Sequence, residues 1–169
     1  MMILNTRTEK YSGRGPVKVY WSTGKNHQGC LRVHPDDSVE DIAVMAELVA
    51  IRYLLFKKQV HDRAPDWGKG YLLSVSKGAI RKLVLGTSSK KQLLPYARFL
   101  KARMQGAEVS VSHKMSDVEL ALDKEPEDIY VNEEFREAHD RIETPAMGTV
   151  YLTKHAVEQY IERITSGTP

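Results

Sequence analysis

The chain has 169 residues, which fits one domain with a single core, and its 41% hydrophobic and 28% charged residues exclude wholesale disorder. No apolar run approaches the roughly 20 residues that span a bilayer, and polar residues follow the first four at once, so we expect no signal peptide and a cytoplasmic protein. The single cysteine, Cys30, excludes an internal disulfide and a multi-cysteine zinc site, and we expect it to be a small core residue.

The N-terminal half alternates short β patterns with one strong helical pattern. Residues 1–15 are polar with two glycines, and we expect a flexible arm there. Alternating β-formers predict strands over 17–22 and 29–34, joined as a hairpin. A helix is predicted over 39–58, apolar on nearly all sides and therefore buried, and a central strand over 70–75.

Two shorter helices and another strand follow. Ser76 is expected to cap a helix over 77–85 that Gly86 ends, and Pro95 suits the first turn of a helix that runs to about residue 105. A strand is predicted over 108–112. Strands that alternate with helices imply an α/β domain with at least one parallel strand pair.

The C-terminal part is predicted to be a separate extension. Residues 123–132 read as an acidic linker, and a charged helix is expected over 133–142. A strand over 149–152 and a helix over 154–164 would follow. The expected organisation is an arm at 1–15, a domain at 16–122, the linker, and a helical extension at 133–169 that packs on the core.

Charge is segregated along the chain. Residues 67–107 contain no acid, and 116–144 contain eleven acids against three bases. A basic block without acids is typical of a phosphate-binding surface, although a solvated helix face is the alternative. The predicted nucleic-acid contacts are Lys77, Arg81, Lys82, Lys90, Lys91, Arg98, Lys101 and Arg103. Three roles are open for the acidic segment Asp117–Glu143: it folds back on these bases, it binds a basic partner, or it serves as a solubilising linker.

Several segments resemble the ribonuclease H-like superfamily over residues 17–122. Val17–Gly24 is similar to the family's first strand and turn, and Ala46–Ile51 is similar to the start of its main helix. Leu73–Ile80 resembles the strand and helix start that carry an Asp-Ser pair, and Pro95–His113 resembles its long helix and following strand. The resemblance implies a mixed sheet flanked by helices.

Active members of that family hold two divalent metal ions between four carboxylates, which activate water and stabilise the leaving oxygen of a phosphodiester. In this comparison Ser22 occupies the first aspartate position, Glu47 is retained, and Val75 replaces the second aspartate. The last carboxylate has no clear equivalent, although Asp117 and Glu119 lie in the expected region. We therefore predict no metal site, no cofactor and no two-metal hydrolysis.

Three residues remain as weak catalytic candidates. Glu47 is either a boundary glutamate paired with a nearby lysine or a remnant metal ligand. His113 is a turn histidine that the resemblance connects with product release. His155 begins a C-terminal run similar to helix starts of small RNA-cleaving toxin-like domains, where histidine is a general acid-base; a docking amphipathic helix is the alternative.

The sequence thus favours a degenerate ribonuclease H-like protein, a pseudoenzyme that binds RNA or an RNA-containing duplex through its basic surface. Tyr20 and Trp21 would add base stacking if they are exposed. One alternative is an interaction or inhibitor module that engages a nucleic-acid enzyme through the acidic segment. Another is a metal-independent ribonuclease that uses His155 or His113. No membrane partner is expected.

Overall fold

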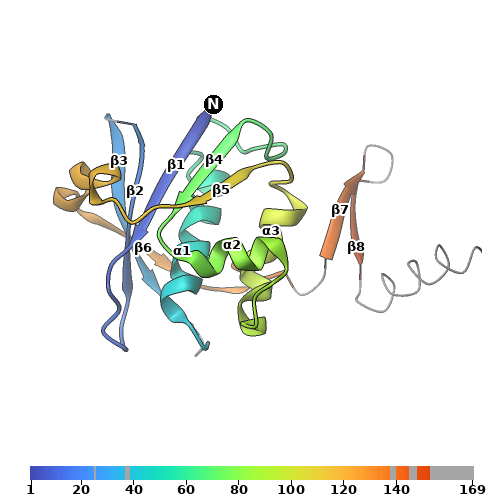
Figure 1. Ribbon diagram of the computed structural model, residues 1–169, viewed down its shortest axis with the longest axis horizontal. Coiled ribbons are helices and arrows are strands. Elements are labelled where there is room, and N and C mark those ends of the chain that lie inside the picture. The colour runs from blue at the N-terminus through green and yellow to red at the C-terminus, as the bar shows by residue number, and fades with distance from the viewer. Residues whose placement is uncertain (25, 37–38, 138–139, 145–147, 153–169) are drawn as a thin grey trace, which may run out of the picture.

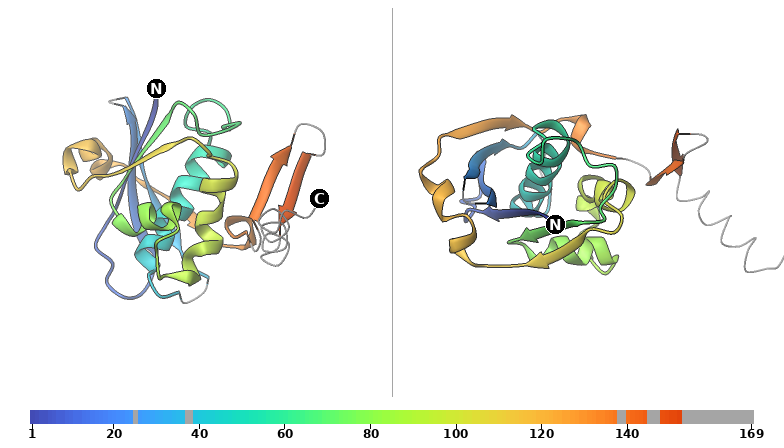
Figure 2. Two further views of the ribbon diagram at one scale, coloured as in Figure 1. Left: turned by 45° about the vertical axis from the view of Figure 1, so that its right-hand side comes forward. Right: turned by 90° about the horizontal axis from the view of Figure 1, so that it is seen from above.

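The computed structural model describes residues 1–24, 26–36, 39–137, 140–144 and 148–152. A six-stranded mixed sheet forms its centre, with helices packed on one face (Figures 1 and 2). Its strand order is β5-β4-β1-β2-β3-β6. The bounds are Met2–Thr8 for β1, Val17–Gly24 for β2, His27–His34 for β3, Tyr71–Val75 for β4, Glu108–Val111 for β5 and Pro126–Tyr130 for β6. The predicted α/β class, a mixed sheet flanked by helices, is confirmed.

The sheet combines an antiparallel meander with parallel crossovers. β1, β2 and β3 pair antiparallel, which confirms the predicted hairpin. β4 pairs parallel with β1 and with β5, so it is central as predicted. β6 adds a further parallel pair at the other edge, beside β3. Each parallel pair requires a crossover, and α1 provides the one between the meander and β4.

The prediction of a flexible arm over residues 1–15 is wrong for Met2–Thr8, which form the central strand β1. Leu4, Thr6 and Thr8 alternate toward the core, and Asn5 and Arg7 point to the opposite face. Threonine has high β-propensity, but two of the three buried positions are polar, so the segment lacks the apolar alternation that marks most strands. Its neighbours β2 and β4 satisfy its backbone.

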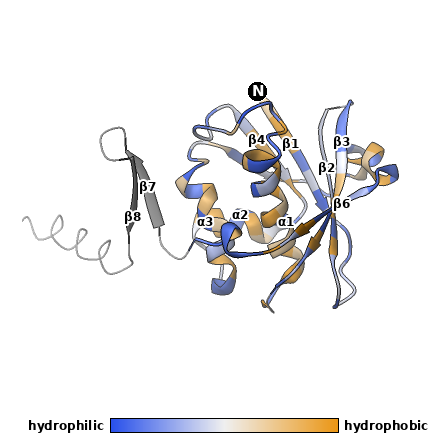
Figure 3. Ribbon diagram, turned by 180° about the vertical axis from the view of Figure 1, so that it is seen from behind, coloured by the Kyte–Doolittle hydropathy of each residue, from blue (hydrophilic) through white to orange (hydrophobic). Residues whose placement is uncertain are grey.

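The helix α1, Ile42–Arg52, crosses the middle of the core and continues as a π-helical turn, η1, at Tyr53–Lys57. Asp41 caps it by accepting a hydrogen bond from the Val44 amide, so it begins three residues later than predicted. Every residue from Val44 to Ile51 is buried, and hydrophobic residues surround most of the helix (Figure 3). The predicted burial on nearly all sides is confirmed.

Two shorter helices complete the layer beside α1. α2, Gly78–Leu85, ends at Gly86 in the left-handed conformation (φ 76°), as predicted. α3, Leu94–Ala102, carries Pro95 in its first turn and follows a 3-10 turn, η2, at Lys91–Leu93. The core joins the apolar sides of these helices to the inward residues of the sheet, among them Leu73, Ile80 and Phe99.

The predicted acidic linker over 123–132 is wrong, because Pro126–Tyr130 forms the edge strand β6. Ile129 and Val131 enter the core, while Asp128 and Tyr130 face outward. Charged outward residues on an edge strand protect it from pairing with other chains, and they conceal the strand in the sequence. Before β6, the 3-10 turns η3 (Met115–Asp117) and η4 (Glu119–Asp123) lie over the ends of β2 and β3.

The C-terminal part differs from the predicted helical extension. A short 3-10 turn, η5, spans Glu133–Phe135, and β7 (Asp140–Thr144) pairs with β8 (Gly148–Leu152) as a second sheet beside α3 (Figure 1). The predicted helix over 133–142 is therefore wrong, and the strand over 149–152 is confirmed. The helix predicted over 154–164 lies outside the described residues. No helix in the described part is long and apolar enough to cross a membrane.

Candidate nucleic-acid interface

Glu47 is completely buried in α1, and hydrogen-bond donors face both of its carboxylate oxygens. The Ser76 amide and hydroxyl donate to Oε1 at 3.1 and 2.5 Å, and the Lys77 amide donates to Oε2 at 3.1 Å. These donors lie where β4 ends and α2 begins, where free helical N–H groups favour an anion. The carboxyl group of Glu47 therefore caps α2. Among the described residues it forms no ion pair with a lysine ammonium, which was one of the two roles that the sequence left open.

The cap ties three elements together. Ser76 also accepts a hydrogen bond from the Thr8 amide of β1 at 3.0 Å, so its hydroxyl links β1 to Glu47. The prediction that Ser76 caps α2 is therefore wrong. Lys77 occupies the N-cap position, and its side chain forms no capping hydrogen bond. Burial raises the pKa of Glu47, and the hydrogen bonds from Ser76 and Lys77 partly oppose that shift.

The structure corrects the positions matched to the family's carboxylates. Val17–Gly24 is the second strand, so Ser22 lies on β2 and not beside Glu47. Its hydroxyl donates to the Asp117 carbonyl and accepts from the Asn5 side chain, on the face of the sheet that α1 does not cover. Val75 is a core residue, and Ser76 is the β4-end residue at Glu47. Thr8 was not predicted, because a flexible arm was expected in place of its strand β1. Its backbone amide completes the surroundings of Glu47 by donating to the Ser76 hydroxyl.

Of the other two acid-base candidates, the structure describes only His113. His113 is exposed and forms no hydrogen bond or ion pair within the described ranges. His155 lies outside the described residues. In that same part of the chain, no three or more His, Cys, Asp or Glu side chains gather where they could hold a metal ion. Cys30 is buried as predicted, and burial raises the pKa of its thiol to about 11, which keeps it protonated.

Part of the predicted basic surface is displayed on α2, α3 and the connection between them. Arg81 and Lys82 are exposed on α2, Lys91 is exposed on η2, and Lys101 is exposed on α3. α2 and α3 pack against each other, and the Lys101 ammonium lies beside Gly86 at the end of α2. These four cations form no ion pair with any described residue, which leaves them available to an anionic ligand.

Three of the predicted contacts are engaged within the chain. Lys90 pairs with Asp41 at the start of α1. Arg98 donates to the Glu137 carbonyl at 2.7 Å, and the Arg103 guanidinium lies 4.7 Å from the centre of the Phe56 ring. Lys77 is half-buried at the N-terminus of α2. The structure therefore separates the predicted basic block into side chains with internal roles and the exposed cations of α2, η2 and α3.

The acidic segment folds back on the chain, but mostly on bases outside the basic block. Its ion pairs join Glu127 to Lys58, Asp128 to Arg32, Glu134 to Lys57, and Glu137 to Arg52, and Asp128 also forms a hydrogen bond with His34. The Arg52–Glu137 pair is the buried one of this group, with a 3.0 Å separation and side chains 14% and 6% exposed. These ion pairs hold the segment against the rest of the chain, and they partly neutralise its negative charge.

Comparison with known proteins gives one structural similarity. No protein-family model matches the chain, and no curated protein matches it. Among solved structures, the chain is similar to the crystal structure of RNase H1 from the halophilic archaeon Halobacterium salinarum NRC-1. The two share 15% sequence identity with a TM-score of 0.46, and the match covers 72% of this chain and 97% of that chain.

Proposed function

We propose that this chain is a ribonuclease H-like pseudoenzyme that binds RNA or an RNA-containing duplex through the exposed cations of α2, η2 and α3. The observation that supports the pseudoenzyme half of this proposal is the environment of Glu47. The family resemblance implies metal-binding carboxylates on the first strand, on the main helix and at the Asp-Ser pair where a later strand meets the next helix. Here Ser76 at the end of β4 hydrogen-bonds Glu47, and Thr8 at the end of β1 joins the niche through its amide bond to Ser76; neither residue is an aspartate.

This niche does not fit a pair of divalent cations. Magnesium requires several oxygen ligands with lone pairs directed at the ion, usually carboxylates and water. Three N–H and O–H donors from Ser76 and Lys77 instead point their hydrogens at the Glu47 oxygens. A cation at those oxygens would displace the donors and leave the first turn of α2 without its cap.

Charge supports the binding part of the proposal. Arg81, Lys82, Lys91 and Lys101 come from a segment without acids, and their ammonium and guanidinium groups have no internal carboxylate partner among the described residues. Such groups bind phosphates and release counterions, so affinity should fall steeply with salt. The acidic segment is a weaker candidate for partner binding, because four of its carboxylates already form ion pairs.

The test is equilibrium binding of a fluorescent RNA–DNA hybrid at several salt concentrations. The double variant Arg81→Glu/Lys82→Glu should weaken binding at least about tenfold and lower the salt slope by about two, one for each lost phosphate contact. Lys10→Glu/Arg14→Glu, which reverses two exposed charges on the connection from β1 to β2, is the matched control. Equal loss in both variants would reject a specific α2 contact.

Cleavage is measured on the same hybrid in magnesium and in manganese. We expect intact substrate with the wild-type chain, because the niche lacks the carboxylates for two-metal hydrolysis. Cleavage that Glu47→Gln abolishes would contradict the proposal.

A further inference from the structure

The face of the sheet opposite the helices carries its own pattern of side chains. Strand register places Arg7 of β1 beside Tyr20 of β2, and Lys18 of β2 beside Arg32 of β3. Arg32 in turn lies beside Asp128 of β6, and His34 lies beside Tyr130. Side chains on one face of neighbouring strands contact each other, so these residues form one continuous surface. We call this surface the outer face.

Among the described residues, only one end of this side of the sheet is covered. η4 lies over the ends of β2 and β3. Asp117 of the preceding turn η3 accepts hydrogen bonds from Ser22 of β2 and from Ser112, which follows β5. The outer face lies farther along the strands. There Tyr130 is 66% exposed, and the side chains of Arg32, His34 and Asp128 are 37%, 28% and 40% exposed.

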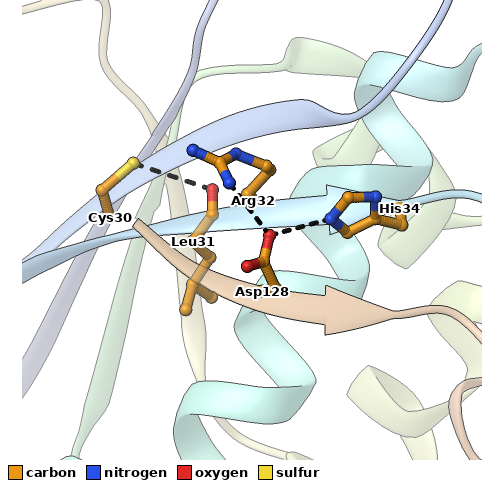
Figure 4. A network of polar contacts seen from close by, with 5 residues as sticks. All are labelled: Cys30, Leu31, Arg32, His34 and Asp128. Atoms are coloured by element: carbon orange, nitrogen blue, oxygen red, sulfur yellow. Dashed lines mark hydrogen bonds and ion pairs between the residues drawn. The ribbon is translucent and has the colours of Figure 1, made fainter. Parts of the chain in front are cut away.

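Two aromatic rings and a fixed ion-pair network form one half of the outer face. The imidazole of His34 stacks on the Tyr130 ring with 4.4 Å between centroids and 12° between planes. Asp128 holds His34 Nε2 at 2.8 Å and an Arg32 guanidinium nitrogen at 3.3 Å (Figure 4). The network orients these groups before any ligand arrives, while the phenol ring remains available to solvent. A preoriented ring loses little conformational freedom on binding.

Cations without partners form the other half. Nη1 of Arg7 is buried and has no hydrogen-bond partner among the described residues. A buried guanidinium nitrogen without an acceptor is destabilising, and an added anion would satisfy it. Lys18 forms no ion pair in the described part of the chain either. Arg7, Lys18 and Arg32 face two acids, Glu9 and Asp128, and Asp128 is already paired, so the outer face remains net positive.

We propose that the outer face binds single-stranded nucleic acid, separately from the basic surface of α2, η2 and α3. Unpaired bases stack on Tyr130 and Tyr20, and Arg7 and Lys18 bind the phosphates between them. A single strand fits this chemistry better than a duplex, because bases within a duplex cannot reach an aromatic side chain on a sheet. Trp21 cannot stack on bases in this way, because its side chain lies on the opposite face of the sheet, in the core, and is only 3% exposed.

The test compares labelled oligouridine with an RNA–DNA hybrid. Tyr130→Ala should weaken oligouridine binding about tenfold or more and leave hybrid binding within about twofold, while Tyr130→Phe, which keeps the ring, should retain affinity. Arg7→Ala should weaken oligouridine binding and reduce its salt slope by about one. Trp67→Ala and Arg63→Ala are the controls, because they remove an exposed aromatic residue and an exposed cation from the loop before β4.

A second measurement does not depend on variants. Ultraviolet cross-linking of wild-type protein to oligouridine, read by mass spectrometry, should mark Tyr130 or Tyr20. Equal affinities of Tyr130→Ala and Trp67→Ala, or cross-links confined to α2 and α3, would overturn the inference. The double variant Arg81→Glu/Lys82→Glu distinguishes binding at the outer face from binding at the basic surface of the proposed function. If only the outer face binds, this variant leaves oligouridine affinity unchanged; if only α2 binds, Tyr130→Ala leaves both affinities unchanged.

Discussion

Truncation of Glu47 to alanine should strongly destabilise the fold. The change removes the acceptor of three hydrogen bonds and leaves the Ser76 amide, its hydroxyl and the Lys77 amide unsatisfied in a buried niche. Each buried donor left without a partner costs about 1 to 3 kcal/mol, and the carboxylate's own burial penalty is relieved. We expect a net loss of about 3 to 5 kcal/mol, or roughly 6–20 °C in the unfolding temperature for a domain of this size.

The assay is urea unfolding followed by circular dichroism, with Ser76→Ala and the double variant measured in parallel. Because both side chains belong to one network, the double variant should lose less stability than the sum of the two single changes, with a coupling of about 0.5–3 kcal/mol. A Glu47→Ala variant within about 1 kcal/mol of the wild type would refute the reasoning, since it would show that nothing depends on the cap.

The pH dependence of stability supplies an independent check on the same group. Burial raises the pKa of Glu47 in the folded state, so the folded chain binds this proton more tightly than the unfolded chain does. The resulting stabilisation is complete below the ordinary glutamate pKa and is lost as pH rises through the raised pKa. Glu47→Gln, which cannot ionise, should flatten that part of the stability profile.

Three further outcomes are expected. Glu137→Ala should lower stability by about 3 kcal/mol because it removes the carboxylate partner of the buried Arg52 guanidinium, whereas Glu134→Ala, at an exposed pair, should leave the urea midpoint unchanged. Cys30, with a thiol pKa of about 11, should not react with a thiol reagent at neutral pH until the chain unfolds. In an NMR titration, His34→Ala should move the lowered pKa of Asp128 back toward its ordinary value; identical titrations would reject the pairing.

The sequence was sufficient for elements whose buried positions are apolar. α1 has a continuous hydrophobic run, α2 ends at a glycine, and α3 begins at a proline, so local chemistry alone determined their approximate bounds. The β2–β3 hairpin was visible because Val17, Val19 and Leu31 alternate with polar residues. Cys30 is also buried, although it neighbours Leu31 in β3 and pairs with Tyr20, so this alternation does not account for its burial.

The errors share a physical cause, because they fall where buried or paired polar groups replace apolar ones. Thr6 and Thr8 conceal β1. Because that strand was missed, the family's first strand was compared with β2, and Ser22 was matched to the first aspartate position although it lies on the second strand. Asp128 conceals β6, because its partners Arg32 and His34 are distant in sequence. The alternation of Leu4, Thr6 and Thr8 was the available signal for β1.

The candidate site shows the same division. The sequence identified Glu47 as an unusual charge in an apolar helix, but its donors come from residues about thirty positions away and become evident only when β4 and α2 are placed against α1. It also identified the basic block, but not that Lys90, Arg98 and Arg103 contact other parts of the chain. Long-range pairing of polar groups leaves no periodic trace in the sequence.

Manganese titration followed by NMR is the most direct test of whether the Glu47 carboxylate caps a helix instead of holding cations. Paramagnetic manganese broadens amide signals near its binding site, and the Ser76 and Lys77 amides lie 3.1 Å from the Glu47 oxygens. With that carboxylate hydrogen-bonded as described, these two signals should broaden no more than amides of the buried core. Selective broadening of both at low manganese, lost in Glu47→Gln, would contradict the pseudoenzyme proposal.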